Sequence, residues 1–137
     1  MSAPSSRLTR PHSDASYEEA VVRKSNLLLE ARLLQAQGRD DEASTRFAGV
    51  ARTEGELAEY CSKLGYNHMA QVHRYGAAGC WALAGNVFEA LAVCNALLDD
   101  LDLSAPLREH VTQYSRTLRA RRRLYYSALE QETAADA

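Results

Sequence analysis

The sequence predicts an all-α fold of about five helices, arranged as antiparallel hairpins. Glycine and proline are scarce, with seven and three residues in a chain of 137, so little interrupts long helices. Apolar residues recur at spacings of three and four, the period of a helix face, and no segment alternates as a strand would. The first three apolar segments each end at a glycine, namely Gly38, Gly65 and Gly85.

Capping residues set the expected helix starts. Ser16 (in a capping box), Asn67 and Asn86 each precede an apolar segment, and Ser104 with Pro106 starts the last helix. The expected helices cover residues 17–38, 40–65, 67–85, 86–101 and 104–130. They form one domain over residues 16–131, with hairpins at 17–65 and 67–101, between disordered tails at 1–15 and 132–137.

The last helix carries the most regular apolar seam. Its members follow a four–three spacing over three heptads: Leu107, Val111, Tyr114, Leu118, Arg121, Tyr125 and Ala128. An uncovered stripe of that length would be an exposed apolar patch. Two uses are open, a cover over the last hairpin or a homodimer through this fifth helix.

An internal repeat relates the two hairpins. Each copy has a small residue seven before a glycine, a glutamate four after it and an alanine five after it. The repeated positions are Ala31, Gly38 and Ala43 in the first copy and Ala78, Gly85 and Ala90 in the second. A repeated helical hairpin has to stack on its neighbour to bury its apolar face. We therefore expect the alanines after the glycines at close helix–helix contacts.

These residues resemble the tetratricopeptide family, in which a glycine closes the first helix of each unit and an alanine lets the second helix approach. The resemblance covers about residues 20–101. The two glycines lie 47 residues apart rather than the family's roughly 34. The resemblance implies a groove for a peptide or partner protein, lined by the first and third helices. Its candidate contacts are Asn26, Glu30, Arg74 and Tyr75. The alternative is a plain bundle, because two units make a short arc.

Signatures of catalysis and metal binding are missing from the sequence. The four histidines are His12, His68, His73 and His110, and none has a glutamate three residues before it, as a di-iron bundle needs. The three cysteines, Cys61, Cys80 and Cys94, lack metal-ligand spacing and are interpreted as reduced core thiols. Cys61 with His73 is one conceivable nucleophile and base. We expect no enzyme activity, metal or cofactor.

A dense group of arginines lies in the fifth helix. The basic patch consists of Arg116, Arg119, Arg122 and Arg123, with Arg121 among them and Tyr125 and Tyr126 after them. One interpretation is contact with phosphates, with the tyrosines stacking on bases. The alternative is a set of solvated faces and salt bridges, because consecutive arginines point all round a helix and the net charge is −2.

Two charged residues occupy positions in apolar seams. Glu54 does so in the second helix and Arg121 in the fifth. Charges at such positions are rarely buried unless they are paired, so a buried Glu54–Arg121 pair would fix the register of the two helices. The alternative is that both side chains face solvent.

Charge and hydropathy narrow the class of function. No apolar run reaches the roughly 18–20 residues that span a bilayer, and no secretory signal is recognisable. We therefore expect a cytoplasmic protein without a membrane partner. Stacked helical hairpins favour a scaffold or adaptor that binds another protein or peptide. The second hypothesis is a nucleic-acid-associated protein that uses the arginines of the fifth helix.

Overall fold

The computed structural model describes residues 15–136, and this part of the chain forms five helices joined by short turns. They are α2 (Ala15–Ala36), α3 (Asp40–Lys63), α4 (Asn67–Leu83), α5 (Val87–Leu98) and α6 (Ala105–Asp136). The predicted all-α class is confirmed, and residues 15–136 contain no strand. The tail predicted at residues 1–15 lies outside the described residues except for Ala15, and His12 also lies outside them.

Each of the first three turns is closed by a glycine in the left-handed region. Gly38, Gly65 and Gly85 have φ angles of 74°, 83° and 84°, which residues with a Cβ rarely adopt. At the first turn the N–H of Arg39 donates to the carbonyl of Leu34 (2.9 Å), while the glycine N–H donates three residues back (3.0 Å). The same two bonds recur at the other two turns, so all three are Schellman motifs and the predicted helix ends are confirmed.

The repeat that the sequence shows twice occurs at all three turns. Buried alanines lie seven residues before and five residues after each glycine: Ala31 and Ala43, Ala58 and Ala70, Ala78 and Ala90. The middle copy escapes the sequence pattern because Met69 stands where the other copies have glutamate. The small side chains let the two antiparallel helices of each turn lie close together. The pattern therefore occurs at all three glycine turns and not only at the first and third.

Two of the four predicted caps are present. The side-chain oxygen of Asn86 accepts a hydrogen bond from the N–H three residues on (3.0 Å), and Ser104 does the same at 3.4 Å. Asn67 is instead the first residue of α4, where no side chain makes a capping hydrogen bond, so its assignment as a cap is wrong. Ser16 is the second described residue of α2. The last helix, α6, continues to Asp136, so most of the segment predicted as a tail at 132–137 lies within it.

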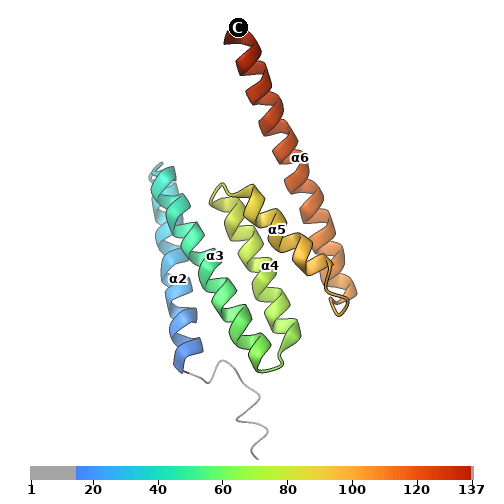
Figure 1. Cartoon of the computed structure of the whole chain (residues 1–137). Coiled ribbons are helices and arrows are strands. Elements are labelled where there is room, and N and C mark those ends of the chain that lie inside the picture. Colours follow the sequence, from blue (N-terminus) through green and yellow to red (C-terminus); the bar gives the residue numbers. More distant parts are fainter. Residues whose placement is uncertain (1–14, 137) are drawn as a thin grey trace, which may run out of the picture.

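The helices stack in sequence order, and each packs mainly on its neighbours along the chain (Figure 1). The largest buried cluster joins α4, α5 and the first half of α6. Its members on α6 end at Leu118. Tyr126 still contacts Phe88 of α5, and the C-terminal part of α6 projects past the other four helices (Figure 1). The fifth helix is thus a cover for the last hairpin over only half of its length.

Candidate functional site

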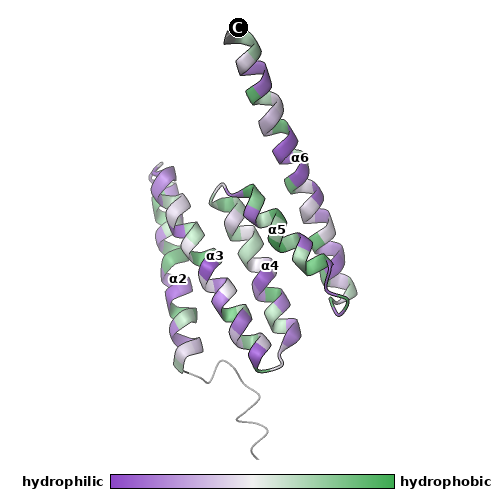
Figure 2. Ribbon diagram, in the orientation of Figure 1, coloured by the Kyte–Doolittle hydropathy of each residue, from purple (hydrophilic) through white to green (hydrophobic). Residues whose placement is uncertain are grey.

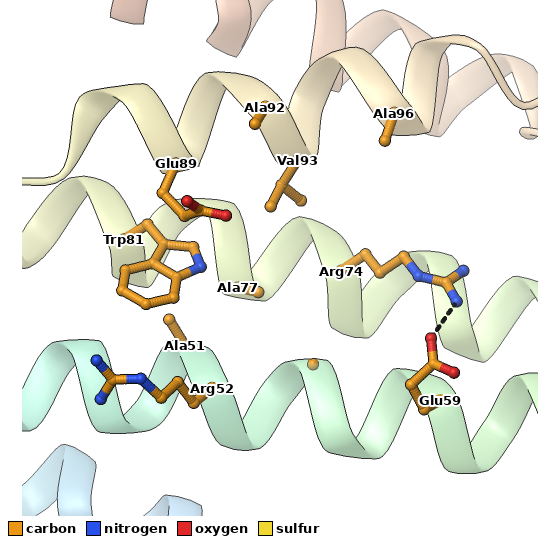
Figure 3. A pocket seen from close by; sticks show the side chains of 11 residues that line it. Ala51, Arg52, Glu59, Arg74, Ala77, Trp81, Glu89, Ala92, Val93 and Ala96 are labelled. Atoms are coloured by element: carbon orange, nitrogen blue, oxygen red, sulfur yellow. Dashed lines mark ion pairs between the residues drawn. The ribbon is translucent and has the colours of Figure 1, made fainter.

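An open groove runs along α4 between α3 and α5, with a volume of about 390 Å³. Five of its eleven lining residues are small, and they come from all three helices: Ala51, Gly55, Ala77, Ala92 and Ala96. Figure 3 shows α4 in the middle of the groove and the other two helices on either side. The groove therefore runs parallel to the helices, and the small side chains on each helix leave it open.

Gly55 keeps part of this channel empty. A Cβ at this position would have no heavy atom within 4 Å. Close packing inside the chain therefore does not require a glycine here, although a glycine within a helix costs about 1 kcal/mol relative to alanine. The space beside Gly55 on α3 is therefore not filled by the chain's own side chains.

Aromatic and charged side chains mark the two ends of the groove. At one end the Cζ atom of Arg52 lies 5.5 Å from the ring centre of Trp81, with Glu89 alongside (Figure 3). At the other end Arg74 pairs with Glu59 at 3.5 Å (Figure 3). Exposed contacts of these kinds are worth about 1 kcal/mol or less. A ligand in the groove can replace them at small cost.

The four contacts implied by the family resemblance do not come together. Arg74 lines the groove, whereas Tyr75 packs edge-on against Tyr114 of α6, with ring centres 5.9 Å apart. Glu30 on α2 accepts a hydrogen bond from Arg46 at 2.8 Å, and Asn26 is exposed on the same helix. Because the groove is formed by α3, α4 and α5, a groove between the first and third helices is not what the structure shows.

The outer face of α2 is a second exposed surface. Three large apolar side chains, Val22, Leu29 and Leu33, are more than half exposed on this helix. Asn26 lies at the helical spacing between them. No described helix covers this face, since α2 packs chiefly on α3. The prediction of Asn26 as a contact residue therefore concerns this surface and not the groove.

A partly buried polar cluster joins α2, α3 and α4. Nδ1 of His73 lies 2.8 Å from Oε1 of Glu54, and Nε2 lies 3.0 Å from the Tyr17 hydroxyl. Lys24 donates to the same carboxylate at 3.3 Å. Since a carboxylate can only accept, Nδ1 carries the proton, and in the neutral ring Nε2 accepts from the tyrosine. A Cβ at Gly76 would clash with the Glu54 carboxylate, so the glycine makes room for the cluster.

The predicted Glu54–Arg121 pair is wrong. Glu54 is bound by Lys24 and His73 from the two helices that flank α3. Arg121 is exposed on α6, which makes its main contacts with α5. The seam positions of the two helices therefore do not face each other. Arg121 is exposed to solvent, as the alternative interpretation expected for this residue. Sequence spacing within single helices gives no sign of the Glu54–His73 contact.

The cysteines lie in the core as thiols. All three are free, and Cys61 and Cys94 are buried. Burial raises the pKa of Cys61, and a hydrogen bond with the Tyr17 hydroxyl partly offsets it. Burial likewise raises the pKa of Tyr17, with the Cys61 side chain adding to the effect. A thiol held in its protonated form is a poor nucleophile, and His73 is engaged by other partners.

The basic patch of α6 is spread around the helix. Arg119 donates to the side-chain oxygen of Asn95 on α5 at 2.9 Å, while Arg116 and Arg123 are exposed. Arg122 lies with Arg121 in a cleft of about 290 Å³, between Tyr125 and Tyr126 of α6 and Phe88 of α5. Only two of the five arginines therefore face the same concave surface.

Comparison with known proteins adds no relative, since no family model, curated protein or solved structure matches the chain. Within the described residues no group of three or more histidine, cysteine or acidic side chains could hold a metal ion. No helix in that part of the chain is long and apolar enough to cross a membrane.

Proposed function

We propose that the protein is an interaction scaffold or adaptor that binds a helical segment of another protein in the groove along α4. The observation that carries this proposal is a channel lined by five small residues from three consecutive helices. Small side chains let the backbone of a fourth helix approach closely. Helix-in-groove binding of this kind anchors the apolar face of an amphipathic partner helix.

The ends of the groove favour a partner that carries both charge signs. Arg52 and Arg74 can attract acidic side chains, whereas Glu89 and Glu59 can attract basic ones. Trp81 offers an aromatic ring at one end, and tryptophan is enriched among residues that dominate binding energy. We expect the partner helix to set its apolar residues on the alanines and its charges over these ends.

The tetratricopeptide-like identity remains a prediction. Consecutive stacking of antiparallel helices is common to many helical arrays and does not single out this family. The resemblance relies on a glycine and alanine pattern that here occurs at every turn. A scaffold role does not depend on that identity, because it follows from the groove.

Photo-crosslinking at Gly55 tests the proposal. A benzophenone amino acid at this position points into open space and is expected to give one or a few discrete protein adducts in cells of the source organism. Gly79 is the matched control, because it is also a helical glycine at which an added Cβ would meet no atom within 4 Å, but it does not line the groove. The same adducts at both positions, or none at Gly55, would contradict the proposal.

A blocking variant separates binding from folding. Gly55→Gln fills the channel and removes a helical glycine, so we expect unchanged or higher thermal stability together with loss of the adducts formed through a reporter at Ala96. Gly79→Gln should leave the adducts in place. Persistence of the adducts in the Gly55 variant would show that the partner binds elsewhere.

The nucleic-acid hypothesis has weaker support. The arginines of α6 do not form one continuous stripe, and Arg119 is engaged with α5. Acidic residues Glu130 and Glu132 follow on the same exposed segment, where they would repel phosphates. We therefore do not propose nucleic acid as the partner.

A further inference from the structure

The exposed part of α6 has a stripe of apolar side chains that lie largely in solvent, although Tyr126 beside it contacts Phe88 of α5, with ring centres 6.5 Å apart. We name residues 121–135 the free half of α6. Leu124 is 71% exposed, Tyr125 62% and Leu129 40%, and Ala128 is exposed beside them. Figure 2 shows apolar residues among hydrophilic ones along the projecting part of the helix. Spacings of one, three and four place the four residues on one face.

Two opposite charges bracket this stripe. Arg121 stands one turn before Leu124, and Glu132 stands one turn after Leu129, both on the same face as the apolar residues. Both are exposed, and neither takes part in an ion pair within residues 15–136. The order along the helix is therefore positive, apolar, negative.

Such an order is complementary to itself when it is reversed. We propose that the free halves of two copies of this chain pair antiparallel. Centring the pair between Tyr126 and Ser127 sets Leu124 opposite Leu129 of the second copy and Tyr125 opposite Ala128. The same register sets Arg121 opposite Glu132 at both ends. A twofold interface presents the same patch on both subunits, as this arrangement requires.

The charges disfavour the parallel alternative. In register, a parallel pair would place Arg121 against Arg121 and Glu132 against Glu132. Charges beside a helical seam set partner orientation in this way. The pairing also fits the shape of the molecule, because it begins at Arg121, just beyond the last α6 residue of the buried cluster, Leu118 (Figure 1).

The test is the mass of the intact chain in solution against concentration. Sedimentation equilibrium should show a shift from the 15.1 kDa monomer toward twice that mass as concentration rises. Arg121→Glu alone and Glu132→Arg alone should each weaken the dimer about tenfold or more, because each creates two like-charge contacts. The double variant with both changes restores both pairs and should dimerise like the parent.

Mixing the two single variants tests whether their charges meet across the interface. The two single variants are complementary to each other, so an equimolar mixture should form a heterodimer although each alone is largely monomeric. A parallel dimer would recover in the mixture as well, but its single variants would dimerise as well as the parent does, because the parent would already carry two like-charge contacts; that result would overturn the proposed arrangement. A parent chain that stays monomeric, including one that binds mixed-sequence RNA as a monomer, would overturn the proposal itself.

Two exposed leucines locate the interface. Leu124→Asp should abolish dimerisation, whereas Leu29→Asp on the outer face of α2 should leave it unchanged. Both side chains are more than 60% exposed, so neither change should unfold the monomer, which circular dichroism checks. Loss of the dimer only in the α2 variant would place the contact on α2 and overturn the proposal.

Discussion

The two halves of α6 have the same helical period and opposite surroundings. In residues 105–120, Leu107, Val111 and Leu118 are buried against α5. In the free half, Leu124 and Tyr125 continue the apolar pattern in solvent. The difference shows that a regular apolar seam predicts a surface suited to packing. It does not say whether the helix that packs on that surface belongs to the same chain. Deletions and paired substitutions in the two halves can test this contrast.

Deletion of the whole helix should have the largest effect. A chain that ends at Ser104 loses the burial of three large side chains, worth about 5 kcal/mol or more, which is comparable with the total stability of a domain this size. It also exposes Leu97 and Cys94 of α5. We expect an aggregated or unfolded product by circular dichroism and light scattering.

The matched deletion ends at Ala120. It removes only the free half, so in dilute solution its melting temperature should stay within about 2 °C of the parent. If the chain ending at Ser104 melts at the same temperature as well, the packed half of α6 is not part of the core.

Truncation of one leucine in each half gives a smaller contrast. Leu118→Ala removes a fully buried side chain and should cost about 2–5 kcal/mol in the free energy of unfolding. Leu124→Ala, on the exposed half, should change it by less than about 0.5 kcal/mol. Urea titration below the dimerisation range measures both values. Equal costs would mean that the free half also packs within the monomer.

Enlarging an alanine should give the smallest of these effects. Ala90 follows the third glycine and is fully buried, so Ala90→Leu should overpack the α4–α5 contact and cost about 1–3 kcal/mol. Ala128 is exposed, and Ala128→Leu should be close to neutral. Thermal melts of the two variants make the comparison. A neutral result at Ala90 would remove the reason for a small residue at the turns.

Much of the fold could be predicted from the sequence because its signals are local. A glycine with positive φ ends a helix whatever surrounds it, and Gly38, Gly65 and Gly85 did so. Asn86 could be recognised as a cap for the same reason. Asn67 could not be separated from a true cap, because the sequence does not show that α4 begins at this residue and not after it.

The candidate site could be predicted only in part. Four of the eleven residues that line the groove are alanines, which carry no chemical signature in a sequence, and Arg74 is its one residue among the expected partner contacts. The contact between Glu54 and His73 depends on how α3 and α4 lie across each other, which spacing along one helix does not contain. Gly76 was a possible signal, since a glycine inside a helix often makes room for a neighbour.

The stacking of helices in sequence order has a consequence for how the chain folds and opens. Because most contacts join neighbouring helices, few long loops have to close before favourable contacts form, which is typical of fast folding. Helices at the two ends have a main neighbour on one side only, so we expect local opening to begin there. Opening of α2 leaves the three groove helices together, whereas release of the packed half of α6 removes part of the cluster that α4 and α5 share and so weakens the groove.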